Sequence, residues 1–345
     1  MNTLLTLFNP NTLVNSSFCL LCLSTVCYSI PLISTLKSNR VPKVLADVEV
    51  SFNGNTGPLQ NLDYTPEKNN DLINSIIFGL TIIINLLLFT FLSLRWVKEG
   101  YFPLSNLYES LIFLVWCLTI VQLIVEAKTD SQIIGAVLTP LNLYLISFST
   151  SVLPTEMQKA APLVPALQSK WLMLHVSTMI ISYSVLILGS LLSIVFLMLF
   201  IISPKAREGY NVVVSPNKTT SSLTAPEELI DIKSSQKKGL LMLYLDRWSY
   251  RTLGFGVPCL TLGIISGAVW ANEAWGSYWS WDPKENWALV TWIVFASYLH
   301  ARLNEGWKGM QAASLGSLGF IIIWFCYLGV NFLGQGLHSY GWLNV

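Results

Sequence analysis

The sequence predicts an all-α integral membrane protein with about eight transmembrane helices, and three observations support this. Hydrophobic residues make up 53% of the 345 residues and charged residues only 11%, against roughly 25% charged residues in soluble proteins. The mean hydropathy is +0.55. The apolar residues also form runs of about 20 residues, the length that a helix needs to cross a bilayer. Because lipid cannot hydrogen-bond to the backbone, each run is expected to be helical.

Eight apolar runs are the expected spans. The fifth is long enough to extend beyond the bilayer, and the seventh is the shortest. In chain order they cover residues 13–36, 72–94, 104–127, 131–152, 171–203, 252–271, 287–301 and 314–333.

The distribution of positive charge predicts the orientation of these spans. Fifteen of the 20 Lys and Arg residues fall in the loops after spans one, three, five and seven. Cytoplasmic loops of membrane proteins are enriched in Lys and Arg, so these loops are expected on the inner (cytoplasmic or stromal) side and both termini on the outer side. The net charge is only +1, which gives no basis for a nucleic-acid partner.

Four parts of the chain follow from this reading. Spans one and two with the first inner loop make up 1–103, and spans three to five make up 104–203. Residues 204–251 carry eight of the inner-side positive charges, and their Ser-, Thr-, Lys- and Pro-rich centre predicts a flexible inner loop. The last part, 252–345, holds spans six to eight and a tryptophan-rich outer loop.

Tryptophans are concentrated between the sixth and seventh spans. Six of the 13 tryptophans lie in residues 270–292, and Trp275, Trp279 and Trp281 share one short loop with Asp282 and Pro283. An aromatic belt is the alternative interpretation, because Trp prefers the headgroup region of a bilayer. Flat rings gathered in a single loop, however, favour a stacking surface for a large flat ligand.

The chain has three histidines, which the topology places at two depths. His175 lies near the outer end of the fifth span, and His338 follows the eighth span on the same side. Because imidazole is a common axial ligand of haem iron, this pair predicts a bis-His haem site beside the tryptophan loop. His300 lies 13 residues after Trp287, about 20 Å deeper, and indicates a second site. For each histidine a packed structural role is the alternative, and zinc is disfavoured because further ligands at metal spacing are lacking.

The six cysteines lie in or beside apolar runs and predict small buried side chains rather than a secreted disulfide framework. Cys19 and Cys22 have redox spacing without a thioredoxin-like context, and the chain has no C-x-x-C-H haem-attachment site of its own. No Lys or Arg precedes Lys37, so the first apolar run is interpreted as a retained span.

Several stretches resemble the CcsA family of cytochrome c biogenesis proteins (system II), in its cyanobacterial and plastid forms. The segment W-G-S-Y-W-S-W-D-P-K-E-N-W at 275–287 is similar to the WWD motif, the haem-handling segment of that family. The resemblance covers span three and most of 160–345. It also includes N-L-Y-E-S at 106–110, P-A-L-Q-S-K-W-L-M-L-H at 165–175, Y-L-H-A-R at 298–302 and G-V-N-F-L-G-Q-G-L-H-S-Y-G-W at 329–342.

The resemblance implies cytochrome c biogenesis at the step of haem attachment. Haem b is then the transported substrate, which this chain and a CcsB-type partner deliver across the membrane and join to the CXXCH cysteines of apocytochromes c, as parts of a haem lyase (synthase) complex. The resemblance implies a thylakoid membrane location, with the WWD loop facing the lumen.

The resemblance also implies roles for individual residues. His175 and His338 would be the axial ligands of the outer haem. His300 would be a haem ligand at an inner membrane site that a partner histidine completes. The residues implied to bind the haem ring in the WWD loop are Trp275, Trp279, Trp281, Asp282 and Trp287.

Other functions remain alternatives. A CcmC-like haem exporter or chaperone would deliver haem without attaching it, although such relatives resemble the motif region alone. An electron-transfer subunit with b-type haems would need two histidines for each haem, and a transporter is disfavoured by the lack of an internal repeat. Asp282, Lys284 and Glu285 either position haem propionates or substrate, or shape the Asp-Pro turn. Glu109 is expected to be a buried carboxylate.

Overall fold

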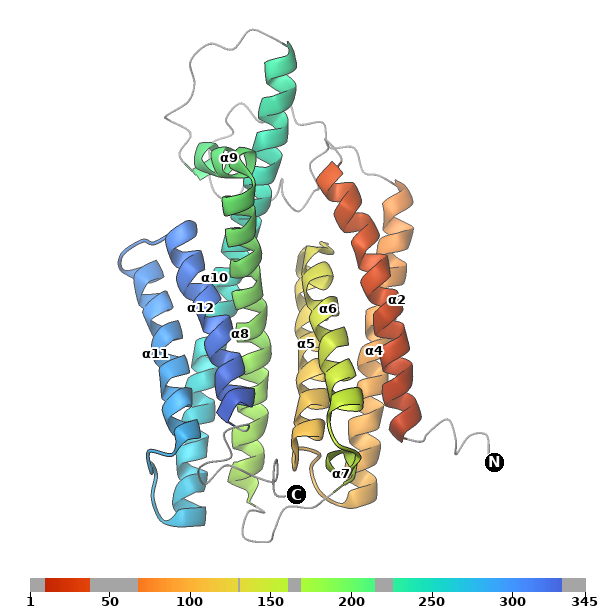
Figure 1. Ribbon diagram of the computed structural model, residues 1–345, viewed down its shortest axis with the longest axis vertical. Helices are drawn as coiled ribbons and strands as arrows, with labels where there is room; N and C mark the ends of the chain where they lie inside the picture. The colour runs from red at the N-terminus through yellow and green to blue at the C-terminus, as the bar shows by residue number, and fades with distance from the viewer. Residues whose placement is uncertain (1–9, 38–67, 130, 161–168, 215–225, 331–345) are drawn as a thin grey trace.

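The computed structural model describes residues 10–37, 68–129, 131–160, 169–214 and 226–330, and all regular secondary structure in these ranges is helical (Figure 1). Seven of the described helices are long and apolar enough to cross a membrane, which confirms the prediction of an all-α integral membrane protein. The helices are α2 (Pro10–Lys37), α4 (Lys68–Glu99), α5 (Leu107–Thr129), α6 (Ile133–Ser147) with the π-helical turn η2 (Phe148–Val152), α7 (Thr155–Gln158), α8 (Lys170–Ile202), α9 (Pro204–Val214), α10 (Pro226–Trp275), α11 (Pro283–Leu303) and α12 (Met310–Trp324) with the π-helical turn η5 (Phe325–Gly329).

The expected seventh span is present as α11, although it is not one of the seven strongly apolar helices. Its ends carry Lys284, Glu285 and Arg302, which lower its mean hydropathy. α11 packs against α10 and α12 in the same bundle. These apolar helices therefore cover two sides of α11, which is the more polar helix.

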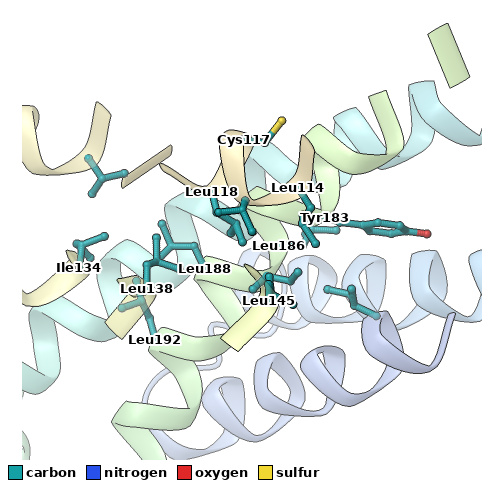
Figure 2. Close-up of a cluster of buried hydrophobic side chains, with 14 of the residues drawn as sticks. Leu114, Cys117, Leu118, Ile134, Leu138, Leu145, Tyr183, Leu186, Leu188 and Leu192 are labelled. Carbon is teal, nitrogen blue, oxygen red and sulfur yellow. The ribbon is translucent and has the colours of Figure 1, made fainter. Parts of the chain in front are cut away.

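The helices form two groups that lie side by side (Figure 1). One group contains α2, α4, α5 and α6, and the other contains α8, α10, α11 and α12, with contacts between α5 and α8 joining them. Figure 2 shows the apolar cluster at this junction, which includes Leu118 of α5, Leu138 of α6 and Leu192 of α8. α8, the expected fifth span, packs chiefly against the C-terminal helices α10 and α12.

The expected loop over 204–251 is largely helical in its described parts. α9 lies across the end of α8, and α10 begins at Pro226 and continues without a break into the sixth span (Figure 1). The sequence placed the start of that span at Thr252 because Asp246, Arg247 and Arg251 interrupt the apolar run. In the structure Asp246 pairs with Arg302 of α11, and that pairing allows the apolar residues before it to be buried.

The bundle has two ends, which we name by their landmarks. The tryptophan-loop end carries residues 276–282, the start of α8 and the α4–α5 connection, whereas the α9 end carries α9 and residues 304–309 (Figure 1). Successive connections therefore lie alternately at the two ends of the bundle, as expected if consecutive helices cross a membrane in opposite directions.

Candidate functional site

His175 is held in a defined orientation at the tryptophan-loop end. It lies in the second turn of α8, and its Nδ1 is 2.7 Å from the carbonyl oxygen of Gly263 on α10. A carbonyl oxygen can only accept a hydrogen bond, so Nδ1 carries the proton in the neutral imidazole and Nε2 carries the lone pair. A histidine that binds a metal through one nitrogen commonly donates a hydrogen bond from the other, often to a backbone carbonyl.

The imidazole of His175 also packs on aromatic rings of α10. Its ring is nearly parallel to that of Trp270, with an interplanar angle of 10° and centroids 6.4 Å apart. Trp270 in turn contacts Trp275 edge-on, with centroids 4.7 Å apart. The start of α8 is tied to the same turn of α10 by Ser169, whose Oγ donates to Glu273 at 2.8 Å. The last turns of α10 therefore fix both the position and the tilt of the histidine.

Gly267 provides the space that the imidazole occupies. A Cβ atom at this position would lie 2.5 Å from Nδ1 and 2.6 Å from Cε1 of His175, which is closer than non-bonded atoms can approach. Gly263 and Gly267 are one helical turn apart on α10 and so lie on the same face. This glycine pair is a part of the site that sequence reasoning missed, although the i, i+4 spacing of the glycines in span six is a visible signal for it.

The tryptophan loop is shaped by the residues that follow it. Asp282 caps α11 in a capping box with Glu285, and the Glu285 carboxylate also accepts hydrogen bonds from the backbone N–H of Ser280 at 2.8 Å and of Asp282 at 3.3 Å. Nδ2 of Asn286 donates to the carbonyl oxygen of Trp281 at 2.9 Å. The sequence offered two roles for Asp282 and Glu285, positioning haem propionates or substrate and shaping the Asp-Pro turn. These contacts show the two side chains shaping the turn.

The backbone bonds hold Trp281 in an unusual and exposed conformation. Its φ angle is +59°, in the left-handed region that bulky residues rarely adopt, and its side chain is 71% exposed. Trp279 meets it edge-on with centroids 6.2 Å apart, and Tyr278 is exposed beside them. An apolar ring held out by a strained backbone indicates a surface for contact with a ligand or another protein.

Trp275 and Trp287 lie further inside the bundle than Trp281. Trp275 is half-buried against Trp270, and Trp287 packs in the first turns of α11 against Phe325 of η5, with ring centroids 4.2 Å apart. The five residues implied for the WWD loop are therefore of two kinds. Trp279 and Trp281 belong to the surface of the loop. Trp275, Asp282 and Trp287 lie deeper in the bundle and support the loop.

His300 lies at the other end of α11 from the tryptophan loop. It is exposed, and its Nδ1 is 2.9 Å from Nδ2 of Asn304. Because α11 is one continuous helix, His300 lies about 20 Å along the helix axis from Trp287, and its depth in the membrane stays a prediction. His338 lies outside the described residues, so its position relative to His175 stays a prediction. Among the described residues no three His, Cys, Asp or Glu side chains gather as a metal site, and the six cysteines are free.

Glu109 has a partner that the sequence did not reveal. Its Oε1 accepts a 2.6 Å hydrogen bond from Nε of Arg95, and both side chains are buried. Tyr101 donates to the same oxygen at 3.0 Å, and Ser105 donates to Oε2 from both its backbone N–H and its hydroxyl at 2.9 Å. Burial raises the pKa of the Tyr101 hydroxyl, which keeps it a donor to the carboxylate.

This ion pair braces the tryptophan-loop end. Nη2 of Arg95 also donates to the backbone carbonyl of Gln158 at 3.0 Å, so Arg95 joins α4, α5 and α7. Next to Glu109, the hydroxyl of Ser110 is 2.9 Å from that of Tyr327 in η5. The two helix groups are thus connected close to the site by polar contacts as well as by the apolar cluster.

Comparison with known proteins identifies relatives along most of the chain. Residues 104–338 match the family described as "Cytochrome C assembly protein". The chain is 55% identical over 284 residues to a "Cytochrome c biogenesis protein CcsA" of Heterosigma akashiwo, covering 80% of this chain and 88% of the relative. A protein of the same name from Guillardia theta is 54% identical over 77% of this chain and 86% of the relative. Another, from Chlamydomonas reinhardtii, is 47% identical over 90% of this chain and 80% of the relative.

Proposed function

The chain belongs to the CcsA family of cytochrome c biogenesis proteins, and on that basis we propose that it acts in cytochrome c biogenesis at the step of haem attachment. In this proposal it binds haem b, its transported substrate, at the tryptophan-loop end. Together with a CcsB-type membrane partner it presents the haem to the CXXCH cysteines of apocytochromes c. It is then one component of a haem lyase complex.

The observation that carries this proposal is the environment of His175. Its Nδ1 proton is committed to Gly263 and its ring is fixed against Trp270, so Nε2 is the nitrogen oriented to bind iron. An aromatic loop lies at the same end of the bundle, with the Trp281 ring exposed. An imidazole ligand beside flat exposed rings is the combination that holds a porphyrin by its iron and its face.

In the proposed reaction, the main contribution of the protein is to position the haem vinyl group and the cysteine thiol. In thioether formation each cysteine thiol adds across a vinyl group of haem: a carbon–sulfur bond forms, the thiol proton passes to the other vinyl carbon, and no group leaves. Proximity and orientation supply most of the acceleration in such additions. Holding haem by its iron and its face leaves the vinyl edge accessible to the substrate cysteines.

The two remaining histidines complete the proposal. His338 is the second axial ligand at the outer site. His300, at the far end of α11, is a ligand at an inner membrane site whose second ligand comes from the partner. We place the chain in the thylakoid membrane with the tryptophan loop facing the lumen, because the positive charges gather at the α9 end and the resemblance is to plastid and cyanobacterial proteins.

A reporter assay tests this function. The chain is co-produced with a CcsB-type partner and an apocytochrome c in a bacterial host that lacks its own attachment system, and covalently bound haem is measured on the denatured cytochrome. We expect His175→Ala to lower attached haem at least about tenfold, and Leu174→Ala, an exposed neighbour on α8, to leave it unchanged. Haem that reaches the outer side without becoming covalently bound would instead identify an exporter. Full attachment by His175→Ala would rule out the proposed ligand.

A further inference from the structure

The backbone conformation of Trp281 is unusual among the residues that the structure describes. In that part of the chain Trp281 is the single non-glycine residue with a positive φ angle, at +59°. For a bulky side chain this left-handed conformation is a strained outlier. Gly276, in the same loop, also has a positive φ angle, +74°, and there glycine avoids the strain. A tryptophan at the second such position indicates that its ring has a use.

Two side chains of α11 hold the strained backbone. The Glu285 carboxylate accepts hydrogen bonds from the backbone N–H of Ser280 at 2.8 Å and from that of Asp282 at 3.3 Å. Nδ2 of Asn286 donates to the carbonyl oxygen of Trp281 at 2.9 Å. The peptide group between Trp281 and Asp282 is thus held at both its N–H and its C=O. Because this peptide group cannot turn over, the backbone stays in the left-handed conformation.

We propose that Glu285 and Asn286 are positioning residues, which keep the Trp281 ring directed outward to contact the face of haem. This inference rests on the proposed function, in which haem is the flat ligand of the tryptophan loop. The Trp281 side chain is 71% exposed, so packing alone does not fix its direction. A ring whose backbone is fixed before binding loses less conformational entropy when the ligand arrives.

The first turn of α11 gives the two positioning side chains a rigid base. Asp282 caps this turn, and the backbone N–H of Asn286 donates to the Asp282 carbonyl oxygen at 3.0 Å. The next residue, Trp287, packs against Phe325 with ring centroids 4.2 Å apart. The helix therefore fixes where Glu285 and Asn286 lie relative to the loop.

Thermal unfolding of the haem-free chain in detergent tests whether the strain is real. Trp281→Gly and Trp281→Ala both remove the ring, but only glycine adopts a positive φ angle without strain. We expect Trp281→Gly to have the higher unfolding midpoint. This reverses the usual order, in which glycine is the less stable because it makes the unfolded chain more flexible. In an Asn286→Leu background, where the peptide group is released, the advantage of glycine should disappear.

Tyr278 provides the matched control for this comparison. It carries another exposed ring of the same loop, and its φ angle is not positive. Tyr278→Ala should therefore unfold at a higher temperature than Tyr278→Gly, the usual order. If alanine were also the more stable residue at position 281, Trp281 would not be held in the left-handed conformation, and the proposal would be overturned.

Haem affinity tests the purpose of the fixed ring. The full chain with its CcsB-type partner is titrated with haem and followed by absorption. We expect Asn286→Leu to weaken haem binding about tenfold. In a Trp281→Gly background the same substitution should have no further effect, because the ring that Asn286 positions is absent. Asn211→Leu, an equal change at an exposed position of α9, should bind haem as the wild type does.

The outcomes distinguish this proposal from the proposed function. Wild-type haem affinity in Asn286→Leu would overturn the positioning role while leaving haem binding itself intact. An equal loss of affinity with and without the Trp281 ring would also overturn it, by showing that Asn286 acts through another group. Absence of haem binding by the wild type would overturn both proposals, whatever the order of stability at position 281.

Discussion

At the scale of single residues, the orientation of His175 depends on two glycines of a neighbouring helix. The Gly263 carbonyl fixes the proton on Nδ1, and the missing side chain of Gly267 leaves room for the ring. Neither contact involves residues near His175 in the sequence, because Gly263 follows it by 88 positions and Gly267 lies one turn further along α10. Sequence patterns located the histidine at the outer end of its span but gave no information on what orients it.

Gly267→Ala is expected to displace the His175 ring and to weaken haem binding at the outer site. The added methyl would overlap the imidazole at 2.5 Å, so the ring must turn away from Gly263 and from its ligand geometry. We expect a loss of about tenfold or more in haem retained by the purified complex, measured from its absorption spectrum.

Gly254→Ala is the matched control for this substitution. It adds the same methyl to the same helix at a position where, in the described part of the chain, the nearest atom of another helix is Cδ2 of Leu299 at 3.9 Å, an ordinary contact distance. Haem retention by Gly254→Ala should equal that of the wild type. Equal haem retention by the two variants, at either level, would show that the fit around His175 has no special role.

At the scale of the helices, polar contacts decide how the tryptophan-loop end is held together. The sequence predicted that Glu109 is a buried carboxylate but did not identify Arg95 as its partner. The two side chains come together only because the connection between α4 and α5 reverses the direction of the chain. Similarly, the charges at 246–251 concealed the true start of the sixth span, because Asp246 is neutralised by a residue of α11. Hydropathy patterns detect apolar runs well and paired charges poorly.

Removing one partner of the Arg95–Glu109 pair should destabilise the protein strongly. Glu109→Leu leaves a guanidinium buried without its counter-charge, at a cost of about 3–5 kcal/mol, which should appear as a lower midpoint of thermal unfolding in detergent. The double variant Arg95→Met/Glu109→Leu should recover most of the loss, because both charges are then absent.

The exposed pair of Lys159 and Glu156 serves as the comparison. Glu156→Ala should change stability by less than about 1 kcal/mol, because exposed ion pairs contribute little. If Glu109→Leu were as mild as Glu156→Ala, the brace between α4, α5 and α7 would have no energetic importance.

At the scale of the whole molecule, the sequence predicted the helical class and the alternation of connections between two ends. The grouping of the helices was less accessible, because it depends on which apolar faces meet: α8 joins the C-terminal helices through contacts with α10 and α12. The seventh span was identified despite its polar ends, since the tryptophans before it mark where α11 begins.

The proposed orientation can be checked by labelling from one side of the membrane. In a background with the six cysteines replaced, Ser277→Cys lies in the tryptophan loop and Glu305→Cys lies at the α9 end. A membrane-impermeant maleimide applied to the lumenal side should modify the first and not the second, because positively charged connections stay on the inner side. Labelling of both from one side would contradict a membrane-spanning α11.

The haem site at His175 is tested most directly by the reduced-minus-oxidised absorption spectrum of the chain purified with a CcsB-type partner. We expect a bis-His, b-type haem spectrum in the wild type. His175→Ala and His338→Ala should each weaken the same component, and His300→Ala should weaken a separate one. If no haem copurifies, or if the spectrum is unchanged in all three variants, then His175 and the tryptophan loop do not form a haem site.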